Sequence, residues 1–388
     1  MTAGLVFTLV LVVLAAIVVA TGILPASDSV ALLDRVGPVL GFVVGITIVT
    51  ELAADAGLFA VLSDRLARWG GRRVWMLWLF VLVLATVSTI FLSLDTTAVL
   101  VTPVVVLLAL HARISPIPFA IATVWLANTA SLLLPISNLT NLLAAEQMSG
   151  GSPLAFASVV WAPAAVGVVV PVVILSLLFR RRLRGSYEVP ERAPIADRTL
   201  LVISAVVVVI LLPALVSGVP VWIPAGIGAL VLLLAFVVRR PTTLRWGLIP
   251  WSPVAIAAGL FVLVEAAQVH GLSDAVAAVS GSGESFPALL QLSGLGALSA
   301  NGINNLPAYL VLEPAAGSPA RLAALLIGVN LGPLITPWAS LATLLWHQRV
   351  TALGVSVPWS RFVVLGLVGV ALLLPLATLA LWLTAGAP

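Results

Sequence analysis

The sequence contains no cysteine and no lysine. The lack of cysteine excludes disulfides, thiolate metal ligands and thiol nucleophiles. The lack of lysine excludes a catalytic or Schiff-base lysine, and it leaves arginine as the only strongly basic residue. Charge of either sign is also scarce, because charged residues make up 8% of the chain, against about a quarter in soluble globular domains. An ordinary soluble domain is therefore excluded.

Apolar residues dominate what is present. They make up 62% of the 388 residues, and the mean hydropathy is +1.23. A net charge of +4 would suggest nucleic acid in a soluble chain, but here the arginines lie in short loops between apolar runs, where they set membrane orientation. We therefore expect an all-α polytopic membrane protein with the lipid bilayer as its surroundings and no nucleic-acid partner.

The apolar stretches predict about nine crossings of the membrane, each needing about 20 residues. Two stretches, 117–147 and 318–346, are long but interrupted, and we expect them to be discontinuous helices. The stretches 74–110 and 284–312 each have polar residues in their middle and are predicted to be re-entrant hairpins. The uninterrupted crossings are expected at 3–24, 36–54, 155–179, 199–217, 219–238, 253–270 and 358–385.

The distribution of arginine predicts the orientation. With this assignment only Arg35 and Arg321 fall on one face, and all other arginines share the opposite face. By the positive-inside rule the arginine-rich face is cytoplasmic, which places the N-terminus in the cytoplasm and the C-terminus outside. Residues 55–70 mix charged and apolar positions and are expected to form an amphipathic helix at the interface.

An internal repeat links the two halves of the sequence. GITIVTELAADAGL at 45–58 reappears as GLFVLVEAAQVHGL at 259–272, and NTASLLLPISNLTN at 128–141 is answered by NLGPLITPWASLAT at 330–343. An odd number of predicted crossings separates the first pair, so the halves should run in opposite directions. Inverted repeats with discontinuous helices are typical of secondary transporters.

The repeat predicts the domain organisation. Residues 1–185 form the first inverted repeat, with the hairpin 74–110 and the broken helix 117–147. Residues 186–198 form a cytoplasmic linker. Residues 199–388 form the second inverted repeat, with the hairpin 284–312 and the broken helix 318–346.

The polar interruptions indicate a binding site. A membrane helix breaks only where its freed backbone groups face protein or a water-filled cavity. Half-helices are expected to begin near Thr96, Asn138, Asn305 and Ser340, and their N-termini should enclose one cup for an oxygen-rich solute and a small cation. The candidate substrate- and ion-binding residues are Ser93, Asp95, Thr96, Thr97, Asn128, Ser137, Asn138, Thr140, Asn141, Asn301, Asn304, Asn305, Asn330, Thr336, Ser340 and Thr343.

Asp95 is the only acidic residue deep within the apolar stretches and away from their ends. Burial penalises the charged form of a carboxylate, which makes Asp95 the candidate for proton coupling. The alternative is that Asp95 caps the half-helix that begins at Thr96 and Thr97. Trp338 lies inside another break and is expected to line the cavity.

Other chemistry finds no support in the sequence. His111, His270 and His347 lack the spacing of a metal site, and no phosphate-binding loop occurs. No Ser, His or Cys dyad has a spacing that suits nucleophilic catalysis. We therefore expect no metal, no cofactor and no enzymatic activity.

Five motifs carry a resemblance to a known family: RLARWGGRR at 65–73, LSLDTTAVLVTPVV at 92–105, ANTASLLLPISNLTN at 127–141, NNLPA at 304–308 and GVNLGPLITPWASLATLLW at 328–346. The chain resembles the ArsB-type arsenite/antimonite permeases of the ion transporter superfamily. The resemblance implies an elevator-type transporter of the bacterial inner membrane, often a homodimer, that exports arsenite against proton entry. It also shows departures, because the family pattern tends to carry acidic residues at the positions of Asn128 and Asn330.

Arsenite or antimonite efflux coupled to proton entry is the function that we expect. Both solutes are mostly neutral trihydroxides near neutral pH, and a cup of amides, hydroxyls and helix N-termini without arginine suits such a solute. Two alternatives from the same superfamily stay open. A sodium/proton antiporter would use Asp95 and the hairpin carbonyls for cation exchange, and a dicarboxylate or sulfate symporter would be driven by sodium.

Overall fold

The computed structural model describes residues 3–189 and 195–385. Every regular element among them is helical, and the only β-type contact is an isolated bridge between Arg73 and Ser186. The predicted all-α class is therefore confirmed. Residues 190–194 of the predicted linker 186–198, with Arg192, lie outside the described residues.

Long helices occupy all seven stretches predicted as uninterrupted crossings. The largest difference is at α2, which begins ten residues before the predicted 36–54, because the polar segment after Pro25 also folds as helix. The helices are α1 (Ala3–Ala20), α2 (Ala26–Asp55), α9 (Pro153–Phe179), α10 (Arg198–Ala214), α11 (Trp222–Arg239), α12 (Trp251–Ala267) and α18 (Trp359–Ala385).

Two pairs of helices, each joined at a single turn residue, occupy the stretches predicted as hairpins. In the first, α4 (Val74–Leu92) turns at Ser93 into an arm made of α5 (Leu94–Thr96), the π-helical η1 (Thr97–Val101) and α6 (Thr102–His111). In the second, α14 (Phe286–Ile303) turns at Asn304 into α15 (Asn305–Leu312). The short η7 (Glu313–Ala315) follows α15.

The stretches 117–147 and 318–346 are each divided between two helices. The first consists of α7 (Ile117–Thr129), two short 3-10 turns, η2 (Ala130–Leu132) and η3 (Pro135–Ser137), and α8 (Leu139–Ser149). The second consists of α16 (Pro319–Leu331), an irregular segment and α17 (Leu341–Ala352), so it extends past the predicted end at residue 346. Proline stands in both breaks, where it removes a backbone donor and ends the regular helix.

Three smaller helices lie outside the spans: α3 (Leu58–Trp69), which matches the predicted interfacial helix, the π-helical η6 (Gln268–Leu272) and α13 (Ser273–Ser280). Two 3-10 turns, η4 (Pro241–Thr243) and η5 (Trp246–Leu248), link α11 to α12. By length and composition, seven helices of the described residues could cross a membrane. They are residues 26–55, 74–92, 94–111, 153–179, 222–239, 251–280 and 359–384, so both arms of the first hairpin are included. The protein is therefore a multi-pass membrane protein.

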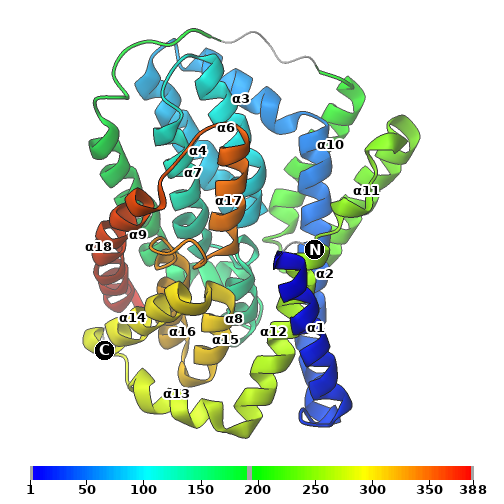
Figure 1. The fold of residues 1–388 in the computed structure, drawn as a ribbon, viewed down its shortest axis with the longest axis vertical. Coiled ribbons are helices and arrows are strands. Elements are labelled where there is room, and N and C mark those ends of the chain that lie inside the picture. Colours follow the sequence, from blue (N-terminus) through cyan, green and yellow to red (C-terminus); the bar gives the residue numbers. More distant parts are fainter. Residues whose placement is uncertain (1–2, 190–194, 386–388) are drawn as a thin grey trace.

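The helices form two groups (Figure 1). In the outer group, which is α1, α2, α10, α11 and α12, α2 packs on α11 and α1 packs on α12. The hairpin group consists of both hairpins, both broken helices, α9 and α18. Within it, α9 packs on α18, on α7 and on α16, and α18 also packs on α16. The groups meet where α2 contacts α8 and where α12 contacts α15.

Asp197 ties together two helices of the outer group. Its carboxylate caps α10 by accepting hydrogen bonds from the amides of Thr199 and Leu200, at 2.9 and 3.1 Å. It also accepts a hydrogen bond from Arg239 of α11, with a distance of 2.8 Å. The Arg239 bond and the bonds from the backbone amides hold the pKa of Asp197 below its usual value.

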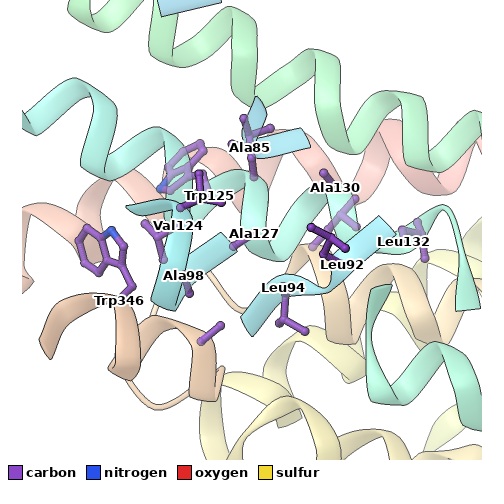
Figure 2. Close-up of a cluster of buried hydrophobic side chains, with 14 of the residues drawn as sticks. Ala85, Leu92, Leu94, Ala98, Val124, Trp125, Ala127, Ala130, Leu132 and Trp346 are labelled. Atoms are coloured by element: carbon purple, nitrogen blue, oxygen red, sulfur yellow. The ribbon is translucent and has the colours of Figure 1, made fainter. Parts of the chain in front are cut away.

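The first hairpin packs within the hairpin group with about half of each arm buried, 50% of Val74–Leu92 and 56% of Leu94–His111. Figure 2 shows Trp125 of α7 close to Ala85 of α4, with Ala98 of the second arm nearby. Trp346 of α17 lies on the same cluster, and its indole N–H donates to the carbonyl oxygen of Ala120 at 2.8 Å. Lipid tails are as apolar as these side chains, so close packing and such hydrogen bonds hold the group together rather than exclusion from water.

The second hairpin packs on α16 through glycine. A Cβ at Gly328 would overlap the carbonyl oxygen of Ser293 in α14, and a Cβ at Gly332 would lie 2.5 Å from the Cβ of Ala297. Small residues allow membrane helices to approach this closely. The contact fixes the position of α14, and with it the position of the hairpin turn at Asn304.

We predict that Gly328→Ala lowers the thermal stability of the purified protein in detergent, because the added methyl group forces α14 and α16 apart. The expected cost is about 1–3 kcal/mol, which is typical of an overpacked contact. Gly294→Ala is the matched control, since Gly294 also lies in α14 but nothing lies within 4 Å of an added Cβ. Equal melting temperatures for the two variants would contradict this account of the packing.

Candidate functional site

Four half-helices begin near the centre of the molecule, and the residues before them fall into two pairs by backbone conformation. The hairpin turns share one geometry, with φ 103° and ψ 160° at Ser93 and φ 98° and ψ 153° at Asn304. The breaks share another, with φ −151° and ψ 145° at Asn138 and φ −142° and ψ 137° at Ser340. Ser93 and Asn304 are non-glycine residues with positive φ, a strained state that concentrates at functional sites.

Three of these four residues cap their own half-helix. The Ser93 hydroxyl accepts from the amide of Thr96 at 3.3 Å, and the Asn138 and Asn304 side chains accept from amides two residues further on. Ser340 makes no such bond, and its buried hydroxyl has no hydrogen-bond partner among the described residues. The half-helix that follows Ser340 therefore has no side-chain N-cap for its first backbone amides.

The capping alternative for Asp95 is wrong. Ser93, not Asp95, supplies the N-cap of the arm that starts at Leu94, because Ser93 is the residue whose side chain accepts from the amide of Thr96. Asp95 lies two residues further, in the first turn of the helix. Its carboxylate is thereby left free for another role.

A cavity of about 570 Å³ lies where the two groups of helices meet. Its hairpin-group wall contains the turns and breaks, and its outer-group wall is formed by residues 40–47 of α2 and residues 252–260 of α12. The lining is mostly apolar, with a few polar side chains that converge, as in typical small-molecule sites. Both hairpins and both broken helices contribute residues to the lining of this one cavity.

Asp95 gives this cavity its only charge. It is the one charged residue in the lining, and its side chain is exposed although it lies at the centre of the molecule. No hydrogen bond or ion pair to Asp95 occurs within the described part of the chain. A carboxylate placed in this way can meet a solute or a proton directly.

The structure divides the predicted site residues into two sets. Those that line the cavity are Ser93, Asp95, Asn138, Asn304, Asn305 and Ser340, and the expectation that Trp338 lines it is confirmed as well. The others do not line it, and most of them hold the breaks in place through hydrogen bonds: Thr96, Thr97, Asn128, Ser137, Thr140, Asn141, Asn301, Asn330, Thr336 and Thr343.

Asn330 joins the two broken helices. Its carbonyl oxygen accepts from the amide group of Asn138 at 2.9 Å and from the hydroxyl of Thr140 at 3.0 Å. Its amide group donates to the side-chain oxygen of Asn141 at 2.6 Å. Asn141 in turn donates to the carbonyl oxygens of Ser131 and Leu134, so only its oxygen faces Asn330. Position 330 therefore needs a side chain that both accepts and donates hydrogen bonds, as the amide of asparagine does.

Asn301 plays the equivalent structural part beside the second break. Its amide group donates to the carbonyl oxygen of Gly332 at 2.8 Å, and its side-chain oxygen accepts from the amide of Thr336 at 2.9 Å. Its backbone oxygen accepts from the indole N–H of Trp338 at 2.8 Å. These bonds hold the irregular segment 332–340 against the second hairpin.

Sequence reasoning missed three polar lining residues, Thr47, Ser252 and Gln348. Gln348 lies on the face of α17 that also presents Leu341 and Leu345 to the cavity, so helical periodicity counted from the break at Ser340 could have found it. Thr47 and Ser252 carried no such signal, because they belong to α2 and α12 and reach the site only through tertiary packing.

No metal centre is apparent in the described ranges, where no group of three or more His, Asp or Glu side chains converges. Glu51 lies near one end of α2 and pairs with Arg245 at 3.5 Å, away from the cavity lining. Polar uncharged groups and the single carboxylate of Asp95 therefore define the chemistry of the site.

We predict that Asn330→Asp destabilises the protein on the order of 3 kcal/mol, because the substitution sets an acceptor against the oxygen of Asn141 and buries a charge. The melting temperature in detergent at neutral pH measures the effect. Gln348→Glu is the matched control, since it makes the same chemical change on an exposed side chain. A melting temperature for Asn330→Asp as high as that of the control would contradict the assignment of donor and acceptor.

The comparisons with known proteins agree with this architecture. A family model described as citrate transporter matches residues 1–343. The arsenical pump membrane protein of Escherichia coli strain K12 is 28% identical over 382 residues, covering 91% of this chain and 88% of the relative. The putative arsenical pump membrane protein of Bacillus subtilis is 24% identical over 364 residues, covering 82% and 81%.

A solved structure has a similar fold. The crystal structure of the Alcanivorax borkumensis YdaH transporter matches with a TM-score of 0.57 at 18% identity, covering 99% of this chain and 98% of that one. The resemblance found in the motifs is confirmed by these relatives, which are membrane transporters and not enzymes. The chain is a secondary transporter and belongs to the citrate transporter family.

Proposed function

We propose that this protein exports arsenite or antimonite in exchange for protons. The observation that carries the proposal is the charge of the cavity. Asp95 is its one charged lining residue, and no arginine takes part in the lining. The chain has no lysine that could supply a cation in its place.

The negative charge of Asp95 in the cavity favours a neutral solute over an anion. Citrate and dicarboxylates are multiply charged anions, which normally need a cation beside them and would be repelled by Asp95. A neutral trihydroxide needs only donors and acceptors, which the side chains of Asn305 and Gln348 offer. The names of the relatives at 28% identity, arsenical pump membrane proteins, support the same solute. Without cysteine in the chain, the solute would bind through its hydroxyl groups and leave easily.

Proton coupling is assigned to Asp95. Its carboxylate lines the cavity without an ion-pair partner in the described ranges, so it is placed to bind and release a proton as the cavity opens to either side. A proton bound when the solute leaves, and released when the solute binds, would link the two movements.

The membrane arrangement that fits this function has nine crossings and two re-entrant hairpins. The N-terminus lies in the cytoplasm and the C-terminus outside, in the inner membrane of a bacterium, with the arginine-rich loops on the cytoplasmic face. Residues 1–185 and 199–388 would be inverted repeats, which the paired backbone conformations at Ser93 and Asn304 support. The hairpin group would move as an elevator against the outer group of a homodimer.

Uptake of arsenite or antimonite into inside-out vesicles with an imposed pH gradient tests the function. We predict gradient-driven accumulation for the unchanged protein, and a fall to the level seen without a gradient for Asp95→Asn. Asp274→Asn, the same change on an exposed residue of α13, should keep the gradient effect. Gradient-driven uptake that is indifferent to Asp95→Asn would remove this residue from the coupling role.

Two further assays, one in these vesicles and one in whole cells, separate the competing functions. Sodium-dependent alkalinisation without any arsenite response would favour a sodium/proton antiporter. Sodium-driven uptake of citrate, a dicarboxylate or sulfate into whole cells would favour a symporter, and it would require that sodium ions and helix N-termini neutralise the anion beside Asp95.

A further inference from the structure

A buried carboxylate lies between the two groups of helices at the end of α2 that carries Arg35. Glu313, in η7 at the base of the second hairpin, is only 5% exposed. It forms an ion pair with Arg35 of α2 and accepts hydrogen bonds from the hydroxyl of Tyr309 and the amide of Gln147, both at 2.9 Å. We call Arg35, Gln147, Tyr309 and Glu313 the far-side cluster.

The far-side cluster connects elements that belong to different groups. Arg35 lies on α2 of the outer group, whereas Tyr309 and Gln147 lie on α15 and α8 of the hairpin group. Close by, Gln268, directly after α12, donates to the carbonyl oxygen of Leu310 at 2.7 Å. Both outer-group helices that line the cavity are therefore bonded to the second hairpin at this end.

A second buried side chain, Arg321 of α16, also holds the base of the second hairpin. Its guanidinium group donates hydrogen bonds to the backbone carbonyl oxygens of Ser280 at 3.1 Å, Gly283 at 3.0 Å and Ala316 at 2.9 Å. These bonds clamp α13 to the hairpin base without any contact to α2. The Arg35 to Glu313 pair therefore adds a connection between the groups rather than support within one of them.

At the other end of α2 no ion pair of the described residues reaches the hairpin group, although Arg349 of α17 lies near enough to attract Glu51 electrostatically. Glu51 and Asp55 pair with Arg245, which lies in the loop between α11 and α12 of the same outer group, at 3.5 and 3.8 Å. Arg349 of α17 makes no ion pair within the described residues. The cavity lining extends toward this end along α17 to Gln348 and to Ser252 at the start of α12.

We propose that the Arg35 to Glu313 ion pair is a gate. It closes the cavity on the far side while the cavity is reached from the arginine-rich face, and it breaks when the hairpin group moves to expose the cavity to the far side. The gate positions the two groups and does not touch the transported solute, because neither residue lines the cavity. The proposal rests on the protein being a transporter and is independent of which solute it carries.

The absence of cysteine makes a direct test simple. A single cysteine introduced as Gln348→Cys reports how accessible the cavity is from the arginine-rich face, through its labelling rate with a membrane-impermeant thiol reagent in inside-out vesicles. Adding Glu313→Gln or Arg35→Gln weakens the gate, shifts the population toward the opposite state and should lower the labelling rate severalfold. Exchanging the charges, with Arg35→Glu together with Glu313→Arg, should restore labelling toward the starting rate.

The direction of the change separates a gate from a structural role. A variant that merely loosened or unfolded the protein would label faster, not slower. Arg239→Gln is the matched control, because it removes an ion pair of 2.8 Å inside the outer group and should leave the rate unchanged. Equal or faster labelling in both single variants would overturn the proposal. Since no transported solute is used, that outcome would leave the arsenite assay unaffected.

Discussion

Each backbone amide and carbonyl group inside a bilayer needs a partner from protein or enclosed water, and the centre of this molecule is arranged around that requirement. Two helices are interrupted there and two hairpins turn there, which frees many such groups at once. Ser93, Asn138 and Asn304 bond to the amides of the helices that they precede. The amide of Asn305 bonds to the carbonyl oxygen of Ala339 at 2.9 Å, which joins the second hairpin to the second broken helix. The interruptions are thus fixed parts of the fold.

This requirement divides the polar residues of the core into two kinds. Most amide and hydroxyl side chains, such as Asn301 and Asn330, are used up in bonds to the backbone and to one another. They make the walls rigid and cannot also bind a solute. The residues left facing the cavity are few, and among them only Asp95 is charged. A site of this kind recognises its solute through a small number of well-held groups, and its single carboxylate stands out as the group that can change charge.

Charge at the ends of α2 has a different role. The helix runs past the cavity with Arg35 before the lining segment and Glu51 after it. At one end the ion pair crosses to the hairpin group, and at the other end it stays within the outer group. Removing one partner of a buried ion pair is costly because it leaves an unpaired charge, and Glu313 is the buried partner here. The contacts at the two ends of α2 therefore differ in which helices they join.

The positions of the long helices, of their polar interruptions and of Asp95 could be predicted from the sequence, because hydropathy, proline and polar residues are local properties of the chain. The sequence also contains the motifs that indicate its family. Which polar residues line the cavity and which stabilise its walls depends on the tertiary structure. Asn138 meets Asn330 across 192 residues of sequence, and Thr47 reaches the site from a helix whose sequence shows no break. The direction of a side chain depends on how distant segments pack, and no local pattern encodes that.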